Sequence, residues 1–137
     1  MSDEKRPEIL VADDLAGQRM VLEMLLSVDG YDVITVEDGK AALDYLKGNT
    51  PALAILDIKM PYLTGLDVCS RMKRIPRLRG VPVIILTALR DEDTVRQAWA
   101  SKADQVIHKP LEGKDFRQTV KDLVASGSKY ADSEPEE

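Results

Sequence analysis

The sequence is poor in residue types on which several classes of protein depend. Its 137 residues include one cysteine, Cys69, and one histidine, His108. A single cysteine excludes an internal disulfide and fits a reducing compartment. Together the two residues offer little to a soft metal such as zinc. The sequence therefore indicates neither a disulfide-rich scaffold nor a zinc site.

Long apolar runs and an excess of basic charge are also missing. The longest apolar runs, such as residues 83–86, have the length of a strand, so we expect no membrane insertion. The first residues, MSDEKRPEIL, contain no hydrophobic segment before a cleavage site, so we expect no signal peptide and a cytoplasmic location. A formal net charge of −5 argues against direct binding of nucleic acid, which requires clustered lysine and arginine.

What the sequence does contain is a regular alternation of two patterns. Short apolar runs occur at residues 9–12, 33–36, 53–57, 81–87 and 105–108. After each of them apolar residues recur every three or four positions, which predicts five helices, the third of them ended by Pro76. The runs are continuously apolar, which is typical of strands buried on both faces. We therefore predict an α/β fold, a single doubly wound five-stranded parallel sheet with helices on both faces.

Polar residues stand at the ends of four of the expected strands. Asp13 and Asp14 follow the first strand, and Asp57 ends the third. Thr87 ends the fourth strand and Lys109 follows the fifth. Ligands of doubly wound sheets bind at the edge where the carboxyl ends of the strands meet. We therefore expect these five side chains to lie together at that edge.

Three carboxylates at one edge repel each other unless a cation neutralises them. Hard oxygen ligands of this kind suit Mg²⁺. Beside such an ion, Asp57 is equipped to attack a phosphorus atom. Lys109 and Mg²⁺ would balance charge on the phosphoryl oxygens, and Thr87 would donate a hydrogen bond to one of them. No nearby residue looks like a base that would hydrolyse the acyl phosphate quickly, so we expect the modification to persist as a signal.

With these residues in place, the sequence resembles the receiver domain of two-component response regulators, which has the CheY-like, flavodoxin-like fold. The matching motifs are LVADD at residues 10–14, VEDGKAAL at 36–43, LDIKMP at 56–61 with Gly65, VIILTA at 83–88 and KP at 109–110. Each motif alone is weak, but all five occur in order and at the expected strand ends.

The resemblance implies a phosphorelay module, not a turnover enzyme, with slow self-dephosphorylation at most. A histidine kinase or phosphotransfer protein would phosphorylate Asp57, and the modification would change the affinity for an unknown downstream protein. The resemblance also implies that Mg²⁺ is bound by Asp14, Asp57 and the backbone carbonyl of Lys59, with Asp13 contributing through water. Gly65 would shape the loop after Asp57.

The resemblance also suggests how the chain is divided. Residues 1–6 are expected to be an N-terminal tail, residues 7–126 the receiver domain, and residues 127–137 an acidic, disordered tail. Cys69 and Trp99 are interpreted as packing residues, and His108 as an ordinary residue at a strand end. The basic stretch 71–79 is expected to be a solvated loop.

Two departures from the family leave the switching mechanism open. Val106 occupies the position three before Lys109, where the family usually has tyrosine or phenylalanine. Lys102 and Ala103 stand in place of the common Gly-Ala, so either Lys102 is left-handed, at about 1 kcal/mol, or the turn differs.

Two other functions compete with that of a phosphoacceptor. A phosphatase of the haloacid dehalogenase type requires a second aspartate two residues after the nucleophile, and Lys59 stands there. A receiver-like docking module that acts without phosphorylation remains an alternative. Phosphate transfer to Asp57 distinguishes it from the phosphoacceptor.

Overall fold

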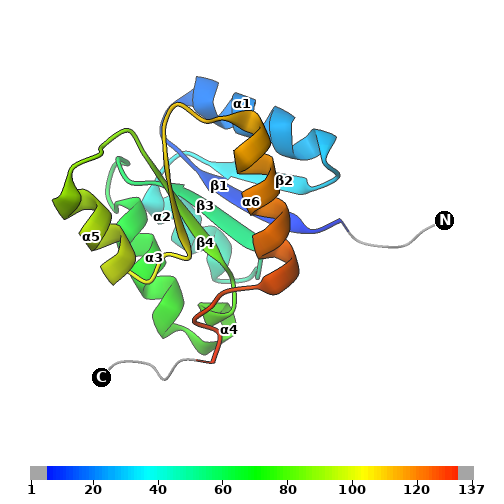
Figure 1. Ribbon diagram of the computed structural model, residues 1–137. Coiled ribbons are helices and arrows are strands. Elements are labelled where there is room, and N and C mark those ends of the chain that lie inside the picture. Colours follow the sequence, from blue (N-terminus) through cyan, green and yellow to red (C-terminus); the bar gives the residue numbers. More distant parts are fainter. Residues whose placement is uncertain (1–5, 133–137) are drawn as a thin grey trace.

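The computed structural model describes residues 6–132 of the 137-residue chain, and within them one sheet is enclosed by helices (Figure 1). The strands are β1 (Glu8–Ala12), β2 (Asp32–Val36), β3 (Leu53–Asp57), β4 (Val83–Thr87) and β5 (Gln105–His108). The helices are α1 (Ala16–Val28), α2 (Gly39–Leu46), α3 (Gly65–Arg74), α4 (Pro76–Arg79), α5 (Glu92–Ala100) and α6 (Gly113–Ser126). No helix in this described part is both long and apolar enough to cross a membrane.

All neighbouring strands are parallel, in the order β2-β1-β3-β4-β5. The chain first moves outward from β1 to β2 and then crosses back to β3 on the other side of β1. The strand order therefore reverses between β1 and β3, and this is the place where doubly wound sheets bind ligands. The predicted fold class is confirmed.

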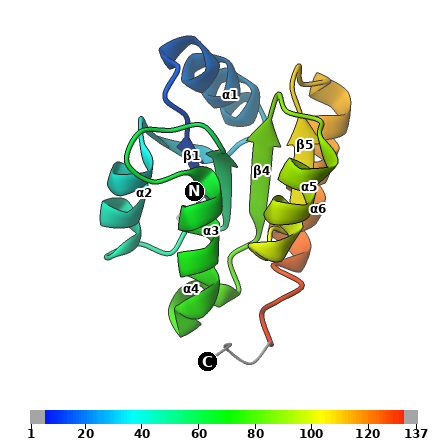
Figure 2. The ribbon, with the colours of Figure 1, turned by 90° about the vertical axis from the view of Figure 1, so that its left-hand side faces the viewer.

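The two faces of the sheet have separate cores. Helices α1 and α6 cover one face, and α2, α3 and α5 cover the other, as the two views in Figures 1 and 2 show. Successive strand residues point to opposite faces, so Leu10 and Leu56 pack on the α3 side while Ile9 and Ile55 pack on the α1 side. Every residue of β3 and β4 is buried. This burial explains why these strands are continuously apolar in sequence.

The basic stretch 71–79 is not the solvated loop that the sequence predicts. It contains the last turn of α3 and the short helix α4. Pro76 ends α3 because it has no N–H for the helical ladder, and it begins α4 because a first turn does not need that donor. Lys73, in the same stretch, is only 3% exposed. A charged residue is stable there only when acceptors surround it, and no local pattern reveals them.

Trp99 is not the core residue that its spacing from Val95 predicts. Ala98 is the buried residue of α5, whereas Trp99 lies at the surface and is 38% exposed. The Nζ atom of Lys129 lies 4.9 Å from the centre of the Trp99 ring. Ala98 and Trp99 are neighbours on the helix, and the smaller side chain is the one that faces the sheet.

Residues 127–132 are folded against the domain, although the sequence predicts disorder from Gly127 onward. Gly127 has a φ of 74°, which favours glycine, and it leads the chain out of α6. Ser128 is buried, and its backbone N–H donates to the carbonyl of Gly80 at 3.1 Å. The prediction of disorder is wrong for this stretch. Residues 133–137 of the predicted tail and residues 1–5 of the N-terminal tail lie outside the described residues.

The sequence leaves two possibilities for the turn before β5, a left-handed Lys102 or a different turn. The structure has the left-handed Lys102. Lys102 adopts a φ of 71° where a glycine would be unstrained. For a residue with a Cβ this conformation costs about 1 kcal/mol.

Candidate functional site

Three carboxylates converge at the edge of the sheet where the strand order reverses. Asp13 and Asp14 follow β1, and Asp57 is the last residue of the adjacent strand β3. One oxygen of each carboxylate lies within 4.8 Å of the others. Asp13 and Asp57 are buried and Asp14 is exposed. The structure thus brings together the carboxylates that the sequence predicts to meet.

Lys109 joins this cluster from the end of β5. Its Nζ atom lies 3.2 Å from an Asp57 oxygen and 3.4 Å from an Asp13 oxygen. The backbone N–H of Lys109 donates to the carbonyl of Thr87 at 2.9 Å, which fixes the start of the Lys109 side chain beside β4. The peptide bond to Pro110 is cis. One ammonium stands against three carboxylates in this cluster, so an excess of two negative charges remains for a cation.

The local environment raises the pKa of Asp57. Burial is the largest cause, because it disfavours the ionised carboxylate, and the charge of Asp13 acts in the same direction. The Lys109 ammonium and the backbone N–H of Lys59 oppose both effects, but they do not cancel them. The ionised side chain therefore lacks full compensation. A divalent cation would supply the missing charge.

Gly65 is required by the position of Asp57. A Cβ atom at residue 65 would lie 2.3 Å from the backbone oxygen of Asp57, closer than any side chain can approach. The Gly65 N–H also donates to the carbonyl of Ile58 at 3.2 Å. The chain therefore returns directly against the tip of β3 before it enters α3. This contact explains why a glycine stands eight residues after Asp57.

Thr87 ends β4 beside the cluster and is buried. Its Oγ1 atom accepts a hydrogen bond from the backbone N–H of Leu89 at 2.9 Å. The hydroxyl hydrogen remains available to another acceptor. Thr87 is thus linked both to the cluster and to the loop that leads into α5.

A cavity of about 550 Å³ opens over these groups. It is lined by Asp14, Leu15, Gln18, Asp57, Lys59, Thr87, Ala88, Leu89, Lys109 and Pro110. Asp13 lies behind this lining, where its carboxylate accepts from the N–H of Leu15 at 2.9 Å. Asp57 is therefore accessible to a ligand in the cavity, whereas Asp13 is not part of the cavity wall.

Sequence reasoning missed the residues that hold and wall this site. The Arg19 guanidinium donates to the backbone oxygen of Asp13 at 2.7 Å and fixes the loop after β1. Leu15, Gln18 and Leu89 form the apolar and polar walls of the cavity. All four are ordinary loop or helix residues in sequence. Only the position of Leu15, directly after the paired aspartates, offered a signal.

The strand order, the acidic cluster at the switch point and the lysine after β5 together define a CheY-like α/β domain. The family model described as the response regulator receiver domain matches residues 9–121 of the chain. The chain therefore belongs to the response regulator receiver family. Members of this family are signalling modules and not typical enzymes.

Individual relatives agree with this assignment. The chain is 38% identical over 120 residues to the "probable transcriptional regulator ycf27" of Porphyridium aerugineum, which covers 88% of this chain and 49% of that protein. The chain thus spans about half the length of that relative. Among solved structures, it is similar to the signal receiver domain of a signal transduction histidine kinase from Syntrophus aciditrophicus, with a TM-score of 0.83, 34% identity, and coverage of 87% of this chain and 90% of the other.

A further solved structure is similar over nearly its whole length. The putative response regulator from Chloroflexus aurantiacus J-10-fl has a TM-score of 0.84 and 28% identity, with coverage of 88% of this chain and 99% of the other. The described fold is therefore one that whole receiver domains adopt.

Proposed function

We propose that Asp57 accepts a phosphoryl group from a histidine kinase or a phosphotransfer protein, and that the modification changes the affinity for a downstream protein. The observation that carries this proposal is the placement of the Asp57 carboxylate, lining a cavity with Lys109 and Thr87 beside an acidic cluster of unbalanced charge. We further infer that the protein acts in the cytoplasm, where Cys69 stays reduced.

In the proposed reaction a phosphoryl group moves from a histidine of the partner to Asp57. A carboxylate oxygen of Asp57 attacks the phosphorus of a phosphohistidine on the partner, and a P–O bond forms as the P–N bond breaks. The leaving imidazole nitrogen keeps the electron pair of the broken bond and takes up a proton. The ammonium of Lys109, now 3.2 Å from the Asp57 carboxylate, is within reach of the new phosphoryl oxygens. The hydroxyl of Thr87 donates to one of them.

The donor set fits Mg²⁺, since three hard oxygen ligands with an excess of two negative charges suit this ion. We infer that Asp14, Asp57 and the backbone carbonyl of Lys59 would hold the ion, with Asp13 acting through water. When bound, Mg²⁺ supplies positive charge beside the oxygens of the phosphoryl group. Lys59 lines the same cavity as Asp14 and Asp57, which supports its inclusion.

The surface of α1 fits a docking site for the phosphodonor. Met20, Met24 and Val28 recur every four residues and are exposed, so they form an apolar stripe along the helix. Leu15, just before the helix, is exposed and also lines the cavity over Asp57. The stripe therefore begins five residues along the chain from a residue of the cavity lining. A partner helix lying on it would bring a phosphohistidine toward Asp57.

We infer that the signal leaves through the loop after β4 and α5. The Oγ1 atom of Thr87 holds the N–H of Leu89, so movement of the hydroxyl toward a phosphoryl group pulls on this loop. Val106, half-buried in β5, is β-branched and has no ring to swing between two positions. The movement of α5 then replaces the aromatic rearrangement that the family usually shows.

The test is phosphorylation by acetyl phosphate in the presence of Mg²⁺, followed by intact mass. We expect the mass to rise by one phosphoryl group, and Asp57→Asn to abolish this gain. Asp44→Asn is the matched control, because Asp44 is exposed on α2 and lies outside the acidic cluster. Equal labelling of wild type and Asp57→Asn would contradict the assignment. If the protein is instead a docking module that acts without phosphorylation, neither the wild type nor any variant should be labelled.

A further inference from the structure

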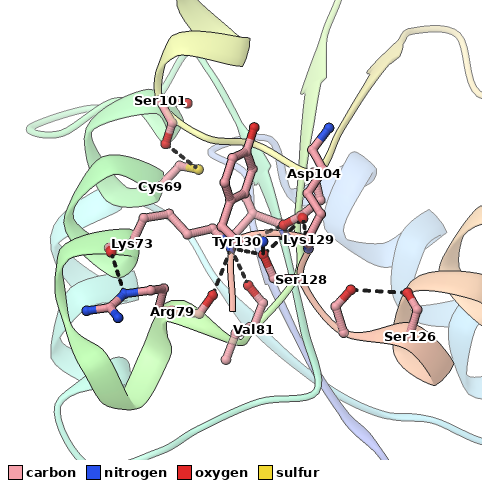
Figure 3. A network of polar contacts seen from close by, with 12 residues as sticks. Cys69, Lys73, Arg79, Val81, Ser101, Asp104, Ser126, Ser128, Lys129 and Tyr130 are labelled. Atoms are coloured by element: carbon pink, nitrogen blue, oxygen red, sulfur yellow. Dashed lines mark hydrogen bonds and ion pairs between the residues drawn. The ribbon is translucent and has the colours of Figure 1, made fainter. Parts of the chain in front are cut away.

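A second group of buried ionic contacts lies at the opposite edge of the sheet, where the strands begin (Figure 3). Lys73 of α3 and Asp104, just before β5, form an ion pair of 3.1 Å between side chains that are almost fully buried. The Lys73 ammonium also donates to the backbone oxygens of Val81 at 2.7 Å and Arg79 at 3.3 Å. Its fourth contact is the hydroxyl oxygen of Ser128, at 2.8 Å.

Asp104 ties the C-terminal segment to this ion pair. One of its oxygens accepts from Lys73 and from the backbone N–H of Val83 at 2.9 Å. The other accepts from the Ser128 hydroxyl and from the backbone N–H of Lys129, both at 2.9 Å. We call residues 128–132 the C-terminal latch. Its first two residues are anchored to the domain by these contacts, and the anchor involves no residue of α5.

The latch reaches from this anchor to α5. The Nζ atom of Lys129 lies 4.9 Å from the centre of the Trp99 ring, and 5.5 Å from that of Tyr130. Trp99 lies in the last turn of α5. The contact is a cation–π interaction, which is favourable even when it is partly solvated. It therefore joins the latch, which follows α6, to a helix on the other face of the sheet.

The attachment of α5 to the rest of the domain is slight. Of its nine residues, all within the described part of the chain, Ala98 alone is buried. A helix with so little buried surface can move as a unit at low free-energy cost. The first residue of α5 follows the loop held by Thr87, and its last turn lies under Lys129. At 1.5 Å per residue, α5 spans about 13 Å between the acceptor edge and the latch.

We propose that the C-terminal latch is closed on Trp99 when Asp57 is unmodified and opens when α5 shifts on phosphorylation. This inference rests on the proposed function of Asp57. The shift separates Trp99 from Lys129, whereas the Lys73–Asp104–Ser128 anchor stays in place. The Lys129 side chain is then free to engage another surface, while its backbone N–H stays bonded to Asp104. The coupling is reciprocal, so loss of the Lys129–Trp99 contact favours the phosphorylated arrangement.

Trp99 is the only tryptophan in the sequence and therefore reports directly on the latch. The experiment measures quenching of its fluorescence by acrylamide, with and without beryllofluoride and Mg²⁺. In the wild type we expect beryllofluoride to increase quenching. Lys129→Ala should be quenched more strongly from the start and should not change further. Lys121→Ala removes a charge from an exposed position on α6 and should behave as the wild type.

Calorimetry of beryllofluoride binding tests the reciprocal effect. We expect Lys129→Ala to bind beryllofluoride about two- to five-fold more tightly than the wild type does. A change of this size corresponds to the energy of a partly exposed cation–π contact. Beryllofluoride could bind without changing the quenching of wild-type Trp99, and with the same affinity for Lys129→Ala as for the wild type. In that case the latch proposal is wrong and the acceptor assignment stands. If beryllofluoride does not bind, or binds Asp57→Asn equally well, the acceptor assignment fails and the latch fails with it.

Discussion

At the edge where the strands end, Lys109 faces the carboxylates of Asp13 and Asp57, while at the edge where they begin Lys73 pairs with Asp104. Both edges contain a lysine–aspartate pair at about the same distance. They differ in charge balance and in solvent access. The Lys109 side chain is 15% exposed beside a cavity, whereas that of Lys73 is 2% exposed.

The difference shows how similar residues produce a candidate binding site and a structural contact. The opposite charges of Lys73 and Asp104 cancel, and each oxygen of Asp104 accepts two hydrogen bonds. Nothing in that arrangement calls for a ligand. At the other edge the acidic cluster has one carboxylate exposed at a cavity and an uncompensated charge. A buried pair that is fully satisfied is structural, and a partly satisfied cluster beside a cavity is a binding site.

The largest expected effect comes from breaking the Lys73–Asp104 ion pair at the edge where the strands begin. We call this edge the closed edge, and the edge with the cavity the open edge. Lys73→Met leaves Asp104 charged and buried, so we expect the free energy of unfolding to fall by about 3–5 kcal/mol. The measurement is urea unfolding of the protein without Mg²⁺. Lys109→Met should cost less, because the Lys109 side chain is 15% exposed beside a cavity that water can enter, whereas that of Lys73 is 2% exposed.

The double variant Lys73→Met/Asp104→Asn is the control for this prediction. It removes the unpaired charge and keeps an acceptor for the N–H of Val83, so most of the lost stability should return. Equal losses in Lys73→Met and Lys109→Met would show that the two edges do not differ as described.

The second effect is a loss of stability at high pH that comes from Cys69. This buried residue lies beside the closed edge, and its thiol donates to the carbonyl of Ser101 at 3.3 Å. Burial raises the pKa of this thiol to about 11 from 9.0. Between these values the unfolded thiol ionises and the folded one does not, so its contribution to stability is present below pH 9 and is lost as the pH rises through 11. The loss should reach about 3 kcal/mol, since two pKa units correspond to that energy.

The measurement compares urea unfolding of wild type and Cys69→Ala across this pH range. The wild type should lose more stability than the variant as the pH rises. If both lose the same amount, the thiol ionises as easily in the folded protein as in the unfolded chain.

The third effect concerns the metal at the open edge. Asp14 is exposed at the cavity, so we expect Asp14→Ala to weaken Mg²⁺ binding about tenfold or more in a calorimetric titration. Asp13→Asn should weaken it less, because Asp13 lies behind the cavity and its amide oxygen still accepts from Leu15. An unchanged affinity in Asp14→Ala, or a larger loss in Asp13→Asn, would remove Asp14 from the proposed ligands.

The smallest effect is a gain in stability. The pKa of Asp57 is raised by burial, so its ionised form destabilises the folded protein, and Asp57→Asn should slightly stabilise the metal-free protein at neutral pH. The gain should vanish at pH values below the pKa of the unfolded carboxyl, where both states are protonated. It should reverse at saturating Mg²⁺, which stabilises the wild type by binding to its folded state. Thermal unfolding with and without Mg²⁺ measures this, and a lower midpoint for the metal-free variant would contradict it.

The meeting of the candidate site residues could be predicted because they stand at positions that the fold makes equivalent. Once β1, β3, β4 and β5 are parallel, Asp13, Asp57, Thr87 and Lys109 must meet, since each ends or follows a strand. The walls of the cavity could not be predicted, because Gln18 and Leu89 come from a helix and a loop whose paths no short pattern specifies.

The closed edge shows the limit of local patterns. Trp99 and Ala98 are equally placed on the helical stripe, and only the space between α5 and the sheet decides which is buried. Lys73 is 31 residues from Asp104 and 55 from Ser128, so its burial depends on partners that no window of sequence contains.

The sequence by itself determined the parallel α/β sheet and the set of residues that meet where its strands end, because apolar periodicity and strand-end position are local properties that fix which way each side chain points. The tertiary structure alone decided the buried Lys73–Asp104–Ser128 network, the surface position of Trp99 and the docking of residues 127–132. The physical reason is that a buried charge or a docked segment is stable only when groups from distant parts of the chain satisfy it at the same time.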